Sequence, residues 1–270
     1  MFKSIMKFMT VLVLTFNYTA SWAWGDRAHA AVSRIAQLYL SQDARTVVSE
    51  ILDGEQMESY ASWFDTYRSV MIIDYVNDEG LNVSGTINHN MKASDSLVII
   101  RQKSREAVDF VCQYTEVLTK RHEVSDSLRL NALLGLIHLV GDIHCPSHVE
   151  FMDKRNGRLA IFPVICMDQN VTLHKVWDTI MFDVNCPGGV EELTRTVLQG
   201  LNEGDVEKIQ LGDPYGWGQE VVNESADLWT IQENGVVSIE YLHQHRDLAY
   251  SLVLKAGLRL AGLLNRLFAS

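Results

Sequence analysis

The sequence predicts an all-α protein, in which one domain forms a compact bundle of many helices. Apolar residues recur at helical spacing along most of the 270-residue chain. Serines suited to helix N-caps precede two of these stretches, and segments with strand-like alternation are few and short. Because 47% of the residues are hydrophobic, the chain is long enough to bury one sizeable core.

The first 23 residues have the composition of a secretory signal peptide. "MFKSIMK" is a basic start, "FMTVLVLTF" an apolar centre, and "SWA" places small residues before a cleavage site after Ala23. The apolar part is too short for a membrane anchor, and no cysteine follows it for a lipid anchor. We therefore expect an exported protein, periplasmic or secreted, whose mature domain spans residues 24–270 and begins at Trp24.

Removal of this segment makes an acidic chain more acidic. It takes away Lys3 and Lys7 and no acidic residue, so the formal net charge changes from −11 to −13. Such a chain repels nucleic acid unless bound cations offset its charge locally.

The first half of the mature chain contains four helical patterns before a central helix. The predicted helices span residues 25–40, 41–52 with a Ser41 cap, 58–70, 96–121 and 125–144 with a Ser125 cap. Residues 74–95 are rich in Asn, Asp, Gly and Ser, which predicts an irregular loop. The stretch 125–144 becomes apolar on every side, so we expect it to be the buried centre of the bundle.

Pro146 ends this central helix, and helices return after a loop. Residues 149–170 are predicted to be loop with a small hairpin near "RLAIFPVI". The remaining periodic stretches predict helices at residues 171–182, 188–201, 216–229 and 241–268.

Two histidine–aspartate pairs stand in apolar helical segments. His138 and Asp142 are four residues apart, as are His174 and Asp178, so each pair shares one helix face. A buried aspartate is costly unless it is paired or bound to a cation. The alternative to a metal site is that both pairs are ordinary hydrogen-bonded pairs in the core.

The new N-terminus supplies two further nitrogen ligands. Trp24 would present a free α-amino group, and His29 follows five residues later. Imidazole nitrogen combined with carboxylate oxygen suits zinc. His29 as a partly exposed helix histidine is the simpler alternative.

Several motifs, in this order, resemble one enzyme family. They are "WGDRAH", "SWFDTYR", "HLVGDIHCPSH", "LHKVWDT" and "WGQEVVNESADL". Together they resemble the zinc-dependent single-strand nucleases of the fungal S-one/P-one type, a family that includes plant bifunctional nucleases. The resemblance spans residues 24 to about 265. It implies an all-α fold of the phospholipase C/P-one nuclease type with a trinuclear zinc cleft.

The resemblance also implies which residues hold three zinc ions. The implied ligands are Trp24, His29, Asp65, His89, His138, Asp142, His148, His174 and Asp178. Asp142 would bridge two ions. Asp65 would also orient the attacking water or accept its proton, and Arg68 would offset phosphoryl charge, unless Arg68 is only a solvated helix arginine.

The expected activity is hydrolysis of single-stranded DNA or RNA to 5′-nucleotides, with removal of 3′-phosphates as a further expectation. Single-stranded nucleic acid or nucleotides would be the substrate, and no stable protein partner is expected. One alternative is a phospholipase C-like enzyme on lipid head groups. Another is a non-catalytic zinc-binding protein.

The sequence departs from the family pattern at one ligand and at the base-binding region. The family histidine that follows Asp65 is matched either by His89, which we favour, or by Asp74 in "DYVN". An aromatic residue expected near this histidine is absent, and Lys92 stands close by as a candidate phosphate ligand. Of the family's later loop motif only Asn156 remains.

The four cysteines leave two interpretations open. An even count in an exported protein predicts one or two disulfides among Cys112, Cys145, Cys166 and Cys186. Cys145 lies three residues before His148, so a zinc thiolate is the alternative for this one residue.

Overall fold

The computed structural model describes residues 25–67, 73–76, 82–85, 91–94, 106–152, 157–158 and 160–269. The predicted signal peptide lies outside these residues. In sequence order, the helices are α1 (Asp26–Leu38), α2 (Gln42–Ile51), η1 (Met57–Tyr60), α3 (Trp63–Tyr67), α4 (Ala107–Thr119), α5 (Asp126–Asp142), η2 (Pro146–His148), α6 (Leu173–Lys175), η3 (Val176–Ile180), α7 (Met181–Asn185), α8 (Gly189–Val197), α9 (Glu203–Ile209), α10 (Pro214–Glu224), η4 (Ala226–Thr230), α11 (Ile239–Gln244) and α12 (Arg246–Phe268).

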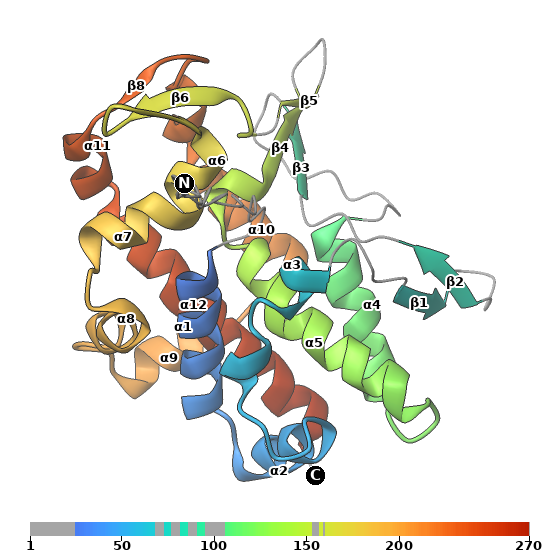
Figure 1. Cartoon of the computed structure of the whole chain (residues 1–270). Helices are drawn as coiled ribbons and strands as arrows, with labels where there is room; N and C mark the ends of the chain where they lie inside the picture. Colours follow the sequence, from blue (N-terminus) through green and yellow to red (C-terminus); the bar gives the residue numbers. More distant parts are fainter. Residues whose placement is uncertain are drawn as a thin grey trace, which may run out of the picture.

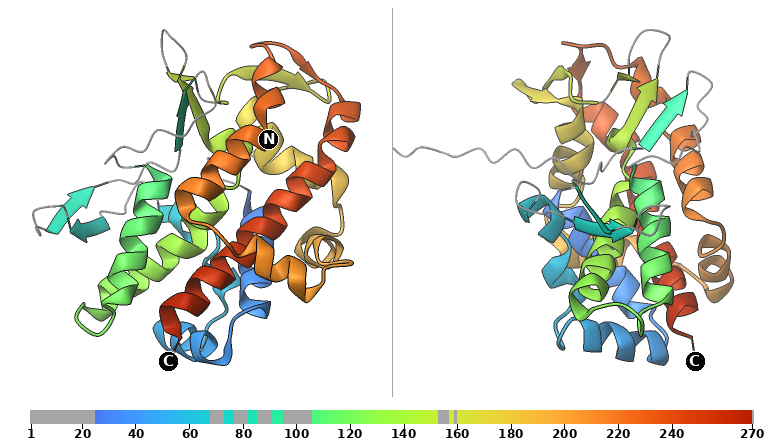
Figure 2. Two further views of the ribbon diagram at one scale, coloured as in Figure 1. Left: turned by 180° about the vertical axis from the view of Figure 1, so that it is seen from behind. Right: turned by 90° about the vertical axis from the view of Figure 1, so that its right-hand side faces the viewer.

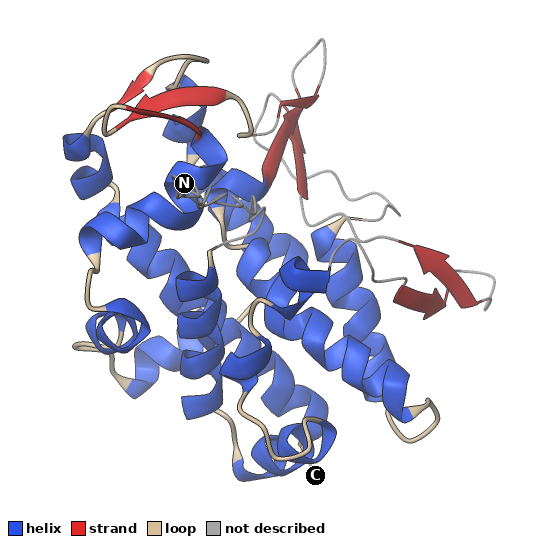
Figure 3. Ribbon diagram, in the orientation of Figure 1, coloured by secondary structure: helices blue, strands red, loops and turns tan. Residues whose placement is uncertain are grey.

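Helices dominate the molecule, and the described strands lie at one end and along one flank (Figure 3). The strands are β1 (Ile73–Val76), β2 (Asn82–Gly85), β3 (Met91–Ser94), β4 (Val149–Met152), β5 (Gly157–Arg158), β6 (Pro163–Cys166), β7 (Gln169–Thr172) and β8 (Val236–Val237). They form small sheets in the orders β1-β2, β3-β4-β5 and β7-β6-β8. The all-α prediction is confirmed, with the hairpin expected near residue 163 formed by β6 and β7.

The core is built around α5, as the apolar stretch predicts. All residues of α5 from Ala132 to Asp142 are buried, and the helix packs along α4 and against α12 (Figures 1 and 2). Glycine permits the closest approach to α4: a Cβ on Gly135 would lie 2.3 Å from the ring of Tyr114. Glycine also permits close packing of α1 against α12, because a Cβ on Gly257 would lie 2.6 Å from Ile35.

Both predicted serine caps begin helices. The Oγ of Ser41 accepts a hydrogen bond from the backbone N–H of Ala44, and the Oγ of Ser125 accepts one from Leu128. Each satisfies a backbone donor that the first helical turn leaves without a partner.

Three predicted helices are wrong in their continuity. Residues 216–229 divide into α10 and η4 at Ser225. Residues 241–268 form α11 and α12, which break at His245. Its Nδ1 donates to the carbonyl of Tyr241 at 2.8 Å and its Nε2 contacts Asp227 at 2.6 Å, so the side chain caps the end of α11. Residues 58–70 likewise divide into η1 and α3, with Arg68 and onward outside the described residues.

The predicted disulfides are absent. No disulfide joins any two of the four cysteines, all of which lie within the described residues. Each belongs to a different part of the fold: α4, the turn before η2, the end of β6 and the end of α7. An even count predicts pairing only where the fold brings two thiols together, and this fold does not.

Candidate metal centre

Two ligand candidates lie at the end of the central helix. His138 and Asp142 are both fully buried, because α5 has no exposed face at this end. The Nδ1 of His138 donates to the carbonyl oxygen of Ala61 at 2.8 Å. This bond fixes the ring so that its Nε2 faces Oδ2 of Asp142 at 3.3 Å and Oδ1 of Asp65 at 3.6 Å.

A third ligand candidate comes from α1. The Nε2 of His29, which is also fully buried, lies 3.3 Å from Oδ1 of Asp142. The rings of His29 and His138 stack with their centroids 4.2 Å apart. Ligand atoms of His29, His138 and Asp142 all lie within 4.8 Å of one another.

The backbone just before α1 is tied to the same region. The backbone N–H of Gly25 donates to the carbonyl oxygen of Asp178 at 2.9 Å. A Cβ on Gly25 would lie 2.8 Å from that oxygen and 3.0 Å from the Oγ1 of Thr179, so only glycine fits here without a shift. The approach places the residue after Trp24 beside a predicted metal ligand.

A second group forms around the turn after α5. His148 and Asp178 are buried, and their ligand atoms lie within 4.8 Å of each other and of the Sγ of Cys145. The ring of His174 lies 4.9 Å, centroid to centroid, from the ring of His148. His174 is held by α6, and Asp178 by the π-helical turn η3, a distortion that often marks functional sites.

The two groups adjoin each other. The Nε2 of His148 lies 3.7 Å from Oδ1 of Asp142, the same oxygen that His29 approaches. The residues of the two groups come from α1, α5, η2 and the segment from α6 to η3, elements that lie far apart in the sequence (Figure 1). Asp142 therefore faces three histidines.

These distances fit zinc better than they fit hydrogen bonds between the side chains. Charge-assisted hydrogen bonds have donor–acceptor distances of about 2.7–2.9 Å. A tetrahedron with metal–ligand bonds of about 2.0–2.1 Å has edges of about 3.3–3.4 Å. The distances of 3.3 Å from Asp142 to His29 and to His138, and of 3.6 Å from Asp65 to His138, are close to such edges. The donor set of imidazoles and carboxylates is also the one zinc prefers.

Burial and neighbouring charges shift the pKa values of the ligand candidates in different directions. Burial, together with His138, lowers the pKa of His29. Burial also acts against protonation of His138, but the carboxylates of Asp142 and Asp65 outweigh it and raise its pKa to about 9. Burial and the nearby carboxylates of Asp65 and Asp142 raise the pKa of Asp178 well above its usual range. A divalent cation in each group would favour the ionised carboxylates and displace protons from the histidines.

Four predicted site residues, Trp24, Arg68, His89 and Asn156, lie outside the described residues. The backbone of Asp74 is described in β1, but its side chain is not. The alternative between His89 and Asp74 as the first-zinc histidine therefore stays a prediction.

Lys92 lies outside the described groups of ligands. Its ammonium is 3.3 Å from Oε1 of the buried Glu106, and its backbone N–H donates to Oε2 at 3.4 Å. Glu106 thus offsets the charge that a phosphate would use, and the role of Lys92 in phosphate binding stays a prediction.

The structure adds contributions that sequence patterns do not reveal. The carbonyl of Ala61, which orients His138, has no sequence signal at all. The close approach of Gly25 to Asp178 depends on two segments far apart in the chain. The place of Cys145 beside His148 had a signal, namely its spacing.

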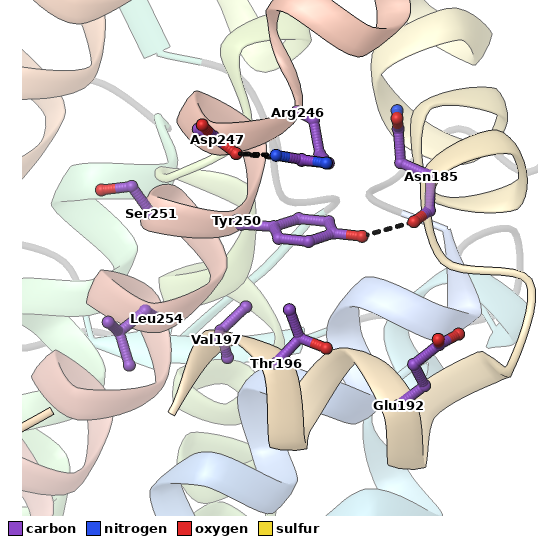
Figure 4. Close-up of a pocket in the computed structure, with 9 residues that line it drawn as sticks. All are labelled: Asn185, Glu192, Thr196, Val197, Arg246, Asp247, Tyr250, Ser251 and Leu254. Carbon is purple, nitrogen blue, oxygen red and sulfur yellow. Dashed lines mark hydrogen bonds and ion pairs between the residues drawn. The ribbon is translucent and has the colours of Figure 1, made fainter. Parts of the chain in front are cut away.

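A different pocket, of about 510 Å³, lies between α8 and α12 (Figure 4). Its polar groups are already engaged: Arg246 bonds to Asp247 at 2.9 Å, and the hydroxyl of Tyr250 donates to the carbonyl of Asn185 at 2.7 Å. None of the predicted site residues lines it.

Comparison with known proteins identifies the family. The model of the family described as S1/P1 Nuclease matches residues 24–269. The chain belongs to the S1/P1 nuclease family. This confirms the resemblance carried by the sequence motifs, and it identifies the chain as an enzyme of a nuclease family.

Individual S1/P1 relatives are distant but match along most of their length. Endonuclease 3 of Arabidopsis thaliana is 27% identical, over 98% of this chain and 96% of the relative. Nuclease S1 of Aspergillus oryzae is 23% identical, over 91% and 92%. Nuclease P1 of Penicillium citrinum is 24% identical, over 79% and 80%. At this level of identity, the roles of individual residues are inferred from the geometry of this chain.

Proposed function

We propose that this protein is an exported, zinc-dependent phosphodiesterase that hydrolyses single-stranded DNA or RNA to 5′-nucleotides and also removes 3′-phosphates. One observation carries the proposal. In a member of the S1/P1 nuclease family, the buried ligand atoms of His29, His138 and Asp142 converge within 4.8 Å, beside a second group that contains His148 and Asp178.

The proposal includes three zinc ions. Asp65, His138 and Asp142 would hold the first, with His89 as the added histidine. His29 and Asp142 would hold the second with the α-amino group of Trp24, a role supported by the hydrogen bond from Gly25 to Asp178. The remaining ligands, His148, His174 and Asp178, would hold the third.

Zinc ions in these positions would polarise a phosphoryl group and lower the pKa of a bound water towards neutrality. The surrounding side chains have their own tasks. Asp65 is the least buried of the described carboxylates of the site, with a side chain 11% exposed, and is suited to accept a proton from the attacking water. Arg68 would offset negative charge that develops on the phosphate.

Electrostatics support a requirement for cations in substrate binding. The chain has a formal charge of −11, and part of that negative charge, from Asp65 and Asp142, lies where a phosphodiester would react. A phosphate anion would be repelled from this region unless bound cations reverse its local charge.

Export and domain limits belong to the same proposal. Cleavage after residue 23 would release Trp24 as the N-terminus and leave residues 24–270 as the nuclease domain. Within the described residues, no helix combines the length and apolar composition that a membrane span requires.

The decisive experiment uses the mature protein, purified with its metals. We would measure release of acid-soluble nucleotides from single-stranded DNA, from duplex DNA and from RNA, with a choline phospholipid as the competing substrate. Metal content and N-terminal sequence would be determined on the same sample. Preferential release from single strands, abolished by a chelator, is the expected result; hydrolysis of the phospholipid alone would overturn the proposal.

A further inference from the structure

We propose that the Sγ of Cys145 is a ligand of the metal held by His148 and Asp178, which makes this ion the most firmly held of the centre. The inference rests on the metal centre proposed above. It adds a thiolate, a ligand of different chemistry from imidazole and carboxylate.

The turn after α5 places the thiol of Cys145 close to the ligand atoms of His148 and Asp178. The N–H of Cys145 donates to the carbonyl of Asp142 at 3.0 Å, and the N–H of His148 donates to the carbonyl of Cys145 at 3.0 Å. These two bonds fix the side chains of Cys145 and His148 on one short, rigid turn. Their ligand atoms and a carboxylate oxygen of Asp178 lie within 4.8 Å of one another.

Asp178 supplies independent evidence for a cation at this point. Its carboxylate is 1% exposed, and within the described residues its Oδ1 accepts no hydrogen bond, although Oδ2 contacts the hydroxyl of Thr179 at 3.3 Å. A buried carboxylate oxygen left in this way costs several kcal/mol unless a cation or proton satisfies it.

A neighbouring hydroxyl suits the thiolate form of Cys145. The Sγ lies 3.1 Å from the Oγ of Ser147, and both residues are fully buried. On metal binding the S–H bond breaks, the proton leaves to solvent, and a metal–sulfur bond forms. The hydroxyl of Ser147 then donates to the sulfur, as groups around metal ligands commonly do.

A thiolate changes what this ion does. Together with Asp178 it balances the two positive charges of zinc, which reduces the ion's capacity to polarise a phosphate oxygen. A site with Cys, two His and Asp also has the four protein ligands typical of closed structural sites. We therefore expect slow metal loss at this site and selection of zinc or cobalt over magnesium or calcium.

The test is cobalt substitution of the mature, metal-free protein. Thiolate coordination gives Co²⁺ an intense sulfur-to-metal charge-transfer band in the near ultraviolet, which imidazole and carboxylate ligands do not produce. We expect the band in the wild type and in Cys186→Ser, whose thiol contacts Glu192 instead, and its loss in Cys145→Ser. Cobalt content is counted in each sample.

If Cys145→Ser does not fold, a triple variant with Ser at Cys112, Cys166 and Cys186 assigns the band by elimination, since only Cys145 remains. Wild-type protein that binds cobalt without the band would overturn the thiolate and leave the metal centre standing. Wild-type protein that binds no cobalt would overturn both.

Discussion

The Nε2 of His29 lies 3.3 Å from the Oδ1 of Asp142, although His29 belongs to α1 and Asp142 is the last residue of α5. The same carboxylate lies 3.3 Å from His138 and 3.7 Å from His148. Asp142 is thus the point where the two described groups of ligands meet. A change at this residue should affect more than one metal ion.

We predict that Asp142→Asn reduces nuclease activity at least about 100-fold, and more than His29→Ala does. The amide keeps the shape of the carboxylate but removes the charge that two ions would share, whereas His29 serves one ion. Asp183→Asn is the control, because Asp183 pairs with Arg27 at 3.1 Å on the surface. Metal content and kcat/KM are measured for all three variants. Equal losses in Asp142→Asn and His29→Ala would contradict a role of Asp142 in holding two ions.

Removal of the metals should destabilise the fold. Without cations the ionised carboxylate of Asp178 is opposed by its burial and by the nearby carboxylates of Asp65 and Asp142. We expect excess chelator to lower the Tm by several degrees and added zinc to restore it. Calorimetry with and without chelator measures this, and an unchanged Tm in protein shown to be metal-free would argue against the prediction.

Asp178→Asn should have opposite effects on stability in the absence and in the presence of metal. Burial raises the pKa of this carboxyl, so the metal-free protein loses stability as the pH rises above the lower pKa that the group has in the unfolded chain. A neutral amide removes that penalty. In urea unfolding at neutral pH, the variant should be more stable than the wild type without metal and less stable with zinc. Lower stability in both conditions would show that the carboxylate has a structural partner.

Gly25→Ala should loosen the backbone just before α1. The added Cβ meets the carbonyl of Asp178 at 2.8 Å, and such overpacking costs about 1–3 kcal/mol. Gly204→Ala is the matched control, since its Cβ meets only Asn202 at an ordinary 3.4 Å in α9. We expect lower zinc content and activity in Gly25→Ala alone. Full zinc content in that variant would separate residue 25 from the metal centre.

Acid should destabilise the protein partly through His144. This buried side chain donates from Nδ1 to the carbonyl of Val140 and accepts at Nε2 from Arg259. Burial and the nearby guanidinium lower its pKa to about 3, against about 6.5 in the unfolded chain. The unfolded state therefore binds the extra proton first, and this contribution to stability is complete above pH 6.5 and is lost as the pH falls towards 3.

The free energy of unfolding of the metal-free protein, measured between pH 7 and pH 4, checks this contribution. His144→Gln keeps a hydrogen-bonding side chain that does not titrate, so its curve should fall less steeply than that of the wild type. Parallel curves would assign the acid sensitivity to other groups.

The sequence predicts the central features of this protein because they are local. The apolar run of α5, the caps at Ser41 and Ser125, and the four-residue spacing of His138 with Asp142 depend on helix geometry and burial alone. The order of the motifs was sufficient to identify the S1/P1 nuclease family, which the family model confirms. Helix continuity failed at His245, whose own side chain caps α11 and contacts the distant Asp227.

Only the tertiary structure decided which of these residues meet. α1 packs so that His29 lies beside Asp142 at the end of α5. The hydrogen bond from Gly25 to Asp178 holds the backbone before α1 against η3. The even cysteine count predicted disulfides, but the fold separates the thiols and sets Cys145 against His148 and Asp178 instead. Spacing within one helix fixes a shared face, whereas contact between elements depends on how their surfaces pack.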